Sequence, residues 1–292
     1  AASDVYKRQI EGSKFIRYSD QIHFDHAGNS SLAAELRTAV RKNQFELHYQ
    51  PRVDLTTGDL VGLEALLRWN HPERGLLTPG EFLTACEDMG LMKTIGYQVI
   101  QHACSALGWL EDQSLHGVDV AVNISFSQVQ DERFVEVVQE IVSRSGMNAS
   151  KLEFELTEST ILKSPGAIKA RMDELRQLGI SFSLDDFGTG FSQLSHLTEL
   201  PISALKIDTN FVRDLPHNPH QEAVCTMIIQ MARRLGMKVV AEGAETHEQI
   251  EFLRSQECEQ VQGFYYSPAI PLQQLPRFVQ EQRVKRDEQL LS

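Results

Sequence analysis

The chain has 292 residues, of which 41% are apolar, and a formal net charge of −12. This length is enough for one large domain, and α/β barrels commonly occupy roughly 250 residues. An acidic chain is poorly suited to non-specific binding of nucleic acid or anionic lipid, so we expect neither as a partner. A phosphate-bearing substrate would need local neutralisation by metal ions or a few basic side chains.

The four cysteines are far apart in the sequence and form no CxxC pair. This spacing indicates neither a zinc site nor a disulfide framework, and it fits a reducing cytosol. No apolar run reaches the roughly 18 residues of a membrane span, and no signal peptide is evident. We therefore expect a cytoplasmic segment without membrane contact. Because the first residue is Ala1 and not Met, we expect a fragment, with any membrane tether in a missing N-terminal region.

The first 30 residues are polar and aperiodic, and we expect a linker or the remnant of a preceding domain over 1–30. One short strand is predicted over 11–18. His23 and His26 are interpreted as part of a solvated linker, and a metal site is the alternative. Helical spacing of apolar residues then predicts a helix over 31–43.

Strands and helices alternate along the rest of the chain. The predicted strands are 45–53, 60–69, 119–125, 151–157, 180–186, 204–207, 238–241 and 260–264. The predicted helices are 79–89, 93–111, 127–144, 165–178, 219–235, 246–255 and 271–285. Several strands are almost continuously apolar, as parallel strands buried on both faces should be. Repeated βα units favour an α/β fold, a closed (β/α)8 TIM-like barrel, over an open sheet. The hairpin turn at 56–59 requires one antiparallel strand.

Acidic and amide side chains lie at the ends of these apolar strands, which in a β/α barrel form the functional face. The candidates are Glu64, Asn123, Glu155, Glu158, Asp185, Asp186, Glu242, Glu245 and Gln262, and only Lys206 adds a positive charge to the series. Crowded carboxylates repel one another without a cation, and converging oxygen ligands suit a hard divalent ion. The set contains no His or Cys, which points to Mg²⁺ or Mn²⁺. Adjacent aspartates suit two ions, which can activate a water for phosphoryl displacement.

Each candidate also has a purely structural interpretation. Asn123 and Glu242 could cap the helices that follow them. Asp185 and Asp186 could be turn acids before glycine, and Lys206 could form a structural ion pair. Glu158 and Gln262 could satisfy loop or backbone groups. Taken together, these interpretations require five unrelated strand ends to carry acids or amides by accident, so the functional interpretation is favoured.

From about Leu32 to Val284, the chain resembles the EAL domain, the bacterial cyclic di-GMP-specific phosphodiesterase. The matched motifs are Tyr49-Gln50-Pro51, Glu64-Ala65-Leu66-Leu67-Arg68-Trp69, Val122-Asn123-Ile124-Ser125, Glu155-Leu156-Thr157-Glu158, Asp185-Asp186-Phe187-Gly188-Thr189-Gly190, Leu205-Lys206-Ile207-Asp208, Ala241-Glu242-Gly243-Ala244-Glu245 and Gln262-Gly263. Departures from the family pattern are Phe191, Gln193 and Ala244, and none removes a ligand. The resemblance implies an EAL phosphodiesterase domain over 31–287 and a tail over 288–292. Residues 11–18 resemble the last strand of a GGDEF (diguanylate cyclase) domain.

The resemblance also implies a reaction, the hydrolysis of cyclic di-GMP to linear pGpG with two Mg²⁺ or Mn²⁺ ions. The implied metal ligands are Glu64, Asn123, Glu155, Asp185, Asp186 and Glu242. The implied catalytic residues are Lys206, Glu242 and Asp186. The implied substrate-binding residues are Gln50, Leu67, Arg68, Asp208, Glu245 and Gln262. Glu158 would anchor the loop over 186–192, which the resemblance links to a homodimer. The alternative is a catalytically weak or inactive cyclic di-GMP receptor or interaction module, whose members usually lack one of these acids.

Overall fold

The structure is a computed structural model that describes residues 26–188 and 199–290. The strand predicted over 11–18, His23 and most of the predicted linker lie outside the described residues. The first described helix, α2 (His26–Arg41), begins five residues before the predicted start at residue 31. The sequence predicts a loop over 26–30 because Gly, Asn and Ser there have low helix propensity, which is a weak preference that the rest of a fold can override.

Ten strands form one sheet in the described part of the chain. They are β1 (Phe45–Asp54), β2 (Leu60–His71), β3 (Gly75–Leu77), β4 (Asp119–Asn123), β5 (Leu152–Thr157), β6 (Ser181–Phe187), β7 (Ala204–Ile207), β8 (Lys238–Glu242), β9 (Gln260–Gln262) and β10 (Ile270–Pro271). The further helices are α3 (Leu83–Asp88), α4 (Met92–Asp112), α5 (Phe126–Val129), α6 (Phe134–Ser145), α7 (Glu158–Lys163), α8 (Pro165–Gln177), α10 (Thr209–Val212), α11 (Pro219–Arg234), α12 (His247–Ser255) and α13 (Leu275–Leu290). Short 3₁₀ turns are η1 (Pro79–Glu81), η2 (Ala149–Lys151) and η3 (Leu272–Gln274).

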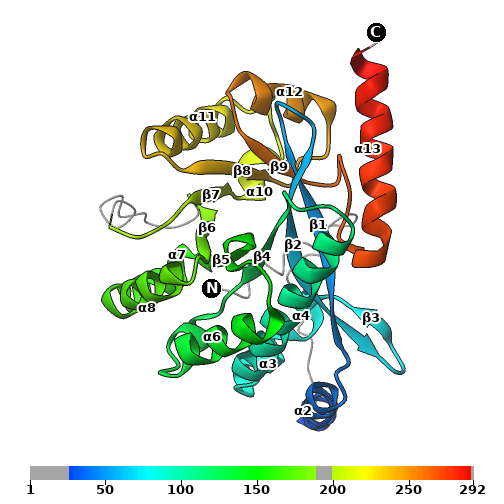
Figure 1. The fold of residues 1–292 in the computed structure, drawn as a ribbon, viewed down its shortest axis with the longest axis vertical. Helices are drawn as coiled ribbons and strands as arrows, with labels where there is room; N and C mark the ends of the chain where they lie inside the picture. Colours follow the sequence, from blue (N-terminus) through cyan, green and yellow to red (C-terminus); the bar gives the residue numbers. More distant parts are fainter. Residues whose placement is uncertain (1–25, 189–198, 291–292) are drawn as a thin grey trace.

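The strands close into a barrel of eight, with helices around the outside (Figure 1). β2, β4, β5, β6, β7, β8 and β9 are parallel neighbours in that order. β1 closes the barrel by pairing antiparallel with both β2 and β9. The predicted (β/α)8 barrel with one antiparallel strand is therefore confirmed, and β1 is that strand. β3 and β10 extend the sheet beyond the closed barrel.

The alternation of β5 shows how the barrel divides its polar and apolar residues. Successive side chains of a strand point to opposite faces. Phe154 faces the helices and packs against Phe134 of α6 and Phe182 of β6, with ring centroids 6.2 and 6.1 Å apart. Glu153 and Glu155 point the other way, into the barrel, and both are buried. The apolar core thus lies between barrel and helices, and the barrel interior holds charged side chains.

The structure differs from the predicted elements mainly in the short ones. One helix is predicted over 127–144, whereas a turn separates α5 from α6. That turn is fixed by Asp131, which accepts hydrogen bonds from Lys93 at 2.6 Å and Tyr97 at 2.7 Å on α4. A helix is also predicted over 271–285, whereas β10 and η3 precede α13. β3, α7 and α10 are not predicted, because they are too short to show a hydrophobic period.

Among the helices of residues 26–188 and 199–290, none combines the length and the apolar composition that crossing a bilayer requires.

Candidate active site

Four strands meet around Glu64, whose side chain is buried inside the barrel. Asn123 of β4 donates a hydrogen bond from Nδ2 to Glu64 Oε1 at 2.8 Å. Gln262 of β9 donates from Nε2 to Glu64 Oε2 and to Gln50 Oε1, the latter at 3.0 Å. Gln50 in turn donates to the carbonyl of Ser267 at 3.2 Å. The structure therefore brings together four predicted site residues that are separated by up to 212 positions in the chain.

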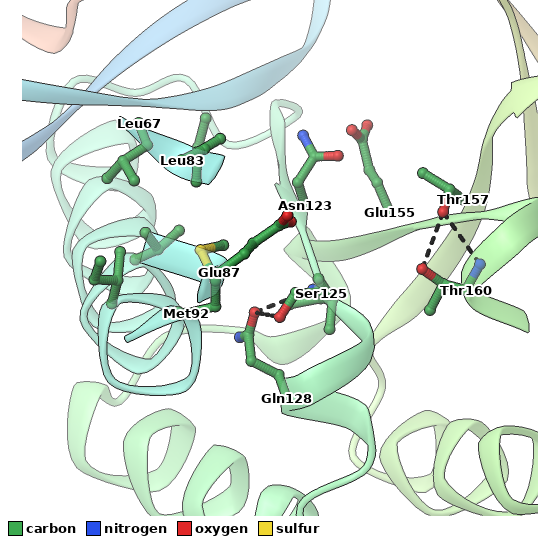
Figure 2. A pocket seen from close by; sticks show the side chains of 15 residues that line it. Leu67, Leu83, Glu87, Met92, Asn123, Ser125, Gln128, Glu155, Thr157 and Thr160 are labelled. Atoms are coloured by element: carbon green, nitrogen blue, oxygen red, sulfur yellow. Dashed lines mark hydrogen bonds between the residues drawn. The ribbon is translucent and has the colours of Figure 1, made fainter. Parts of the chain in front are cut away.

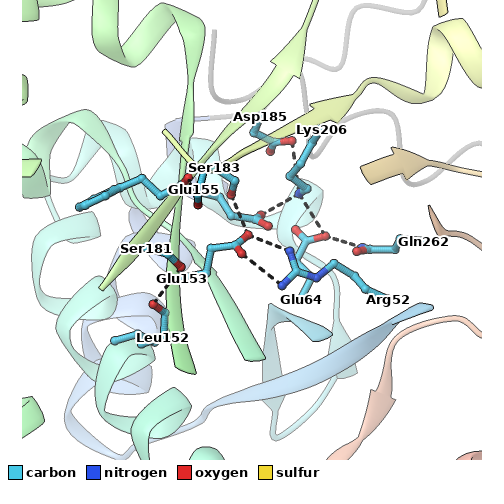
Figure 3. A network of polar contacts seen from close by, with 12 residues as sticks. Arg52, Glu64, Leu152, Glu153, Glu155, Ser181, Ser183, Asp185, Lys206 and Gln262 are labelled. Carbon is cyan, nitrogen blue, oxygen red and sulfur yellow. Dashed lines mark hydrogen bonds and ion pairs between the residues drawn. The ribbon is translucent and has the colours of Figure 1, made fainter. Parts of the chain in front are cut away.

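Lys206 lies at the centre of the acidic side chains and is fully buried (Figure 3). Its Nζ lies 2.7 Å from Glu155 Oε2 and 2.7 Å from Glu242 Oε1. The same atom lies 3.3 Å from Asp185 Oδ1 and 3.5 Å from Glu64 Oε2. Four predicted metal ligands from β2, β5, β6 and β8 thus converge on one ammonium group.

The cluster holds more negative charge than this lysine can neutralise. Burial raises the pKa of Glu155 well above its usual value, as do Glu64 and Asp185, and Lys206 offsets this only in part. Burial and the neighbouring acids likewise raise the pKa of Glu242 well above its usual value. Burial would lower the pKa of Lys206, but the surrounding carboxylates raise it far above its usual value. The lysine is therefore charged, and several carboxylates compete for it.

Glu64 differs from its neighbours because it has more hydrogen-bond donors. Burial would raise the pKa of its carboxyl, but Lys206 and the amides of Gln262 and Asn123 together lower it. A carboxylate that accepts hydrogen bonds while ionised is stabilised in its charged form. Glu64 is therefore ionised and oriented before any ligand arrives.

Asp186 lies where β6 turns away from the barrel. Its backbone φ of +58° is unusual for a residue other than glycine, although Asp tolerates this region better than most. Burial, with the charges of Asp185 and Asp208 nearby, raises its pKa to about 8. Asp208 caps α10, where Oδ1 accepts from the backbone N–H of Asn210 at 2.9 Å. Asp185, Asp186 and Asp208 thus lie close together beside Lys206 and its acidic partners.

The other predicted site residues lie around this cluster. Arg68 is half-buried on β2 and donates from Nη1 to the carbonyl of Leu67 at 2.8 Å. Glu245 is exposed in the segment before α12, and its backbone N–H donates to Gln249 Oε1 at 2.6 Å. Glu158 is the first residue of α7, directly after the N-cap Thr157. Glu158 is predicted to anchor the loop over 186–192, but most of that loop lies outside the described residues. The anchoring role therefore stays a prediction. Phe191 and Gln193 also lie outside the described residues.

A cavity of about 70 Å³ adjoins the cluster, with Asn123 and Glu155 in its wall (Figure 2). Its other walls are mainly apolar and include Leu67, one of the predicted substrate-binding residues. Gln128 of α5 also lines it, and its Oε1 accepts from the backbone N–H of Ser125 at 3.1 Å. Gln128 is not among the predicted site residues, because it lies on a helix too short to show a pattern in the sequence.

Beneath the cluster lies a second group of buried polar residues that are not among the predicted site residues. Arg52 Nη1 lies 2.7 Å from Glu153 Oε1, and Ser183 Oγ donates to the same oxygen at 2.8 Å. The period of two along each strand could have found them, since Arg52 follows Gln50 and Glu153 precedes Glu155 by two residues.

The donor set fits a hard divalent cation, although its side chains are not yet arranged around one. In residues 26–188 and 199–290, no three His, Cys, Asp or Glu side chains already surround a position that could hold a metal ion. They turn toward Lys206 instead. Glu155 Oε1 and Gln262 Oε1 are buried and have no hydrogen-bond partner among the described residues. Unused oxygens and excess negative charge are what such a cation would satisfy.

Comparison with known proteins identifies the family. Residues 33–269 match the EAL domain. The chain is 40% identical over 252 residues to the cyclic di-GMP phosphodiesterase NbdA of Pseudomonas aeruginosa, covering 86% of this chain and 32% of NbdA. It is 40% identical over 244 residues to the bifunctional diguanylate cyclase/cyclic di-GMP phosphodiesterase MucR of the same organism, covering 84% of this chain and 36% of MucR. The chain thus spans about a third of the length of these curated relatives.

Solved structures agree with this assignment. The structure of the PaMucR phosphodiesterase in a c-di-GMP complex matches with a TM-score of 0.81 at 40% identity, covering 84% of this chain and 99% of that one. An EAL domain protein from Listeria monocytogenes matches with a TM-score of 0.74 at 28% identity, covering 84% of this chain and 96% of that one. The chain therefore belongs to the EAL domain family.

Proposed function

We propose that this chain hydrolyses cyclic di-GMP to linear pGpG with the help of two Mg²⁺ or Mn²⁺ ions. One observation carries the proposal, namely the convergence of acidic and amide side chains from the strands of the barrel on one buried centre. The similarity to NbdA and MucR, both named as cyclic di-GMP phosphodiesterases, supports the choice of substrate. The proposed domain covers 31–287, which contains the matched range.

Two overlapping sets of side chains would each hold one ion. Glu64, Asn123, Glu155 and Asp185 would hold one ion, and Asp185, Asp186 and Glu242 the other. When bound, the ions would make a water nucleophilic and stabilise the charge that develops during phosphoryl displacement. Glu64, already ionised and oriented by Asn123 and Gln262, is preorganised for this role. Glu155 and Glu242, whose pKa values burial and the neighbouring acids raise, would bind the ions in their deprotonated form.

Lys206 would change partners when the ions bind. In the structure its ammonium group neutralises the acids, with Glu155 and Glu242 both at 2.7 Å. With those acids holding the ions, Lys206 would be free of them and would face the reacting phosphate. A buried cation there stabilises developing negative charge more strongly than a solvated one would.

The remaining predicted residues would bind and orient the substrate. Arg68 would contact a phosphate group, while Gln50 and Gln262 would line the pocket beside the ions. Leu67 lies in the wall of the apolar cavity, where it can exclude water from the bound substrate. Asp208 and Glu245 remain proposed contacts. We further propose a cytoplasmic location, a homodimer, and an anchoring role for Glu158 in the loop after Asp186.

The decisive test is to incubate the purified protein with cyclic di-GMP and Mg²⁺ or Mn²⁺ and to separate the products by chromatography. We expect linear pGpG to accumulate, EDTA to stop the reaction, and added metal to restore it. The variant Glu155→Gln serves as the inactive control. Binding of cyclic di-GMP without any product would favour the receptor alternative, and full activity in excess chelator would exclude the two-ion mechanism.

A further inference from the structure

Below the acidic cluster, one ion pair crosses the interior of the barrel. Arg52 of β1 contacts Glu153 of β5 through two nitrogens, at 2.7 and 3.4 Å. These strands are not neighbours in the sheet, so the contact spans the barrel interior (Figure 3). Arg52 is only 2% exposed and Glu153 only 7%. We call Arg52 and Glu153 the floor pair.

A glycine on β2 leaves the space that the Arg52 side chain occupies. Gly62 of β2 is the direct partner of Arg52 in the β1–β2 pairing. A Cβ at Gly62 would lie 2.5 Å from Arg52 Nε and 2.6 Å from Nη2, closer than any real contact. A glycine inside a strand often marks such a close approach. Gly62 therefore lets the guanidinium group cross toward β5.

Each member of this lower layer lies two residues from a proposed metal-binding or substrate-binding residue on the same strand. The pairs are Gly62 with Glu64, Arg52 with Gln50, Glu153 with Glu155, and Ser183 with Asp185. Residues two apart on a strand point to the same face. The floor pair thus lies directly beneath the site and links β1, which is paired with β2, to β5.

We propose that Arg52 and Glu153 are positioning residues that hold Glu64 and Glu155 at the separation needed for metal binding. This inference rests on the proposed function, since it concerns the same ions. Without the ions, Lys206 offsets only part of the repulsion among the acids, and the remaining repulsion would push β2 and β5 apart. The floor pair opposes that movement, with Ser183 fixing the orientation of Glu153 at 2.8 Å.

Stability alone does not account for the floor pair. A buried ion pair loses so much hydration that replacing both partners by apolar side chains is often neutral or stabilising. Removing only one partner is different, because it leaves an unpaired buried charge that can unfold the protein. The informative variant is therefore the double change Arg52→Met with Glu153→Leu, which keeps the net charge and leaves neither member of the pair without the other.

The experiment measures Mn²⁺ binding by calorimetry without substrate, followed by steady-state kinetics. We expect the double variant to unfold at a temperature near that of the wild type but to bind Mn²⁺ about 10–100-fold more weakly, as residues that orient metal ligands typically do. At saturating Mn²⁺ most of kcat should return, because the floor pair acts on the ligands and not on the substrate. Lys169→Met is the control, since it removes a cation from the exposed pair with Asp173 on α8.

Several results would overturn the inference. One is wild-type Mn²⁺ affinity in the folded double variant. Another is equal weakening in the Lys169→Met control. Absence of Mn²⁺ binding by the wild type would also reject it. In contrast, a wild type that binds Mn²⁺ more tightly than the double variant but forms no pGpG would refute the proposed reaction and leave the positioning role supported.

Discussion

At the scale of single residues, Lys206 shows how the site remains folded without ions. Four carboxylates within 3.5 Å of one ammonium group would otherwise repel one another in a buried, poorly hydrated space. The lysine thus has two proposed roles, as a substitute cation before the ions bind and as a stabiliser of developing charge afterwards. A variant at this position should separate these roles.

We predict that Lys206→Met lowers the unfolding temperature of the metal-free protein, because it removes the ammonium group that contacts all four acids. Added Mn²⁺ should then raise that temperature more than it does in the wild type. The rate constant kcat should fall by roughly 100–1000-fold, the usual loss when a group that stabilises developing charge is removed. Thermal unfolding and kinetics measure these effects. Lys238→Met, at an exposed lysine of β8, is the matched control, and equal metal-free stability of the two variants would contradict the first role.

The sequence predicted the upper layer of the site better than the floor beneath it. Glu64 and Glu155 were recognisable because a lone carboxylate in an apolar strand is costly unless it has a function. Arg52 and Glu153 were not recognisable. Arg52 lies near a turn and Glu153 near the start of a strand, and charged residues at such positions are usually solvated. Only the closed barrel, which places β5 opposite β1, shows that the two side chains meet.

At the scale of elements, the long helices and barrel strands were predictable and the short ones were not. β10 has two residues and pairs with Tyr49 and His48 of β1, so it owes its conformation to a distant strand. α10 begins at the cap Asp208 directly after β7 and contains only four residues. Such elements are set by tertiary contacts, whereas periodicity in the sequence needs several turns or pairs to be visible.

The turn after β8 provides a test of how closely the backbone is packed at the mouth of the barrel. Gly243 has φ +73°, and an added Cβ would lie 2.4 Å from Thr209 Cγ2. Gly236 has the same φ but nothing within 4 Å of an added Cβ. Both changes to Ala should cost about 1–2 kcal/mol for the backbone, but only Gly243→Ala should add about 1–3 kcal/mol of overpacking.

Gly243 directly follows Glu242, a proposed metal ligand, so a shift of the turn should displace that ligand. We therefore expect Gly243→Ala to reduce activity and Gly236→Ala to leave it unchanged. Urea unfolding of both variants gives the stability difference, and product formation at saturating metal gives the activity. If the two variants lose the same stability and keep the same activity, the turn accommodates the added methyl group and its packing does not position Glu242.

A second matched pair lies within α4. At Gly96 an added Cβ would lie 2.1 Å from Gln128 Nε2, whereas at Gly108 it would meet nothing within 4 Å. Gln128 cannot move freely, because Ser125 donates to its Oε1 from N at 3.1 Å and from Oγ at 2.9 Å. Gly108→Ala should therefore stabilise the helix by about 0.5–1 kcal/mol, and Gly96→Ala should destabilise the protein by about 1–3 kcal/mol. Chemical denaturation measures both, and stabilisation by Gly96→Ala would show that Gln128 is free to move.

At the scale of the whole molecule, closure of the barrel is what creates the site. Gln50 of the antiparallel β1 and Gln262 of β9 come from opposite ends of the chain and meet at 3.0 Å. No segment of the barrel contains the complete ligand set, so a fragment would not be expected to bind the ions. Metal binding and global folding should therefore be coupled.

We predict that Mn²⁺ raises the unfolding temperature of the wild type and that EDTA reverses the rise. Ions held by residues of several barrel strands must be released before the barrel opens, and at 100 times its dissociation constant a ligand stabilises by about 2.7 kcal/mol. For a chain of this size that corresponds to roughly 5 °C. Differential scanning calorimetry measures the shift, and a sodium salt at equal ionic strength controls for general screening of the net charge of −12.

Glu64→Gln, which keeps the side-chain shape and removes the ligand charge, should abolish most of the shift. An equal shift in that variant would mean that the ions bind elsewhere on the acidic surface.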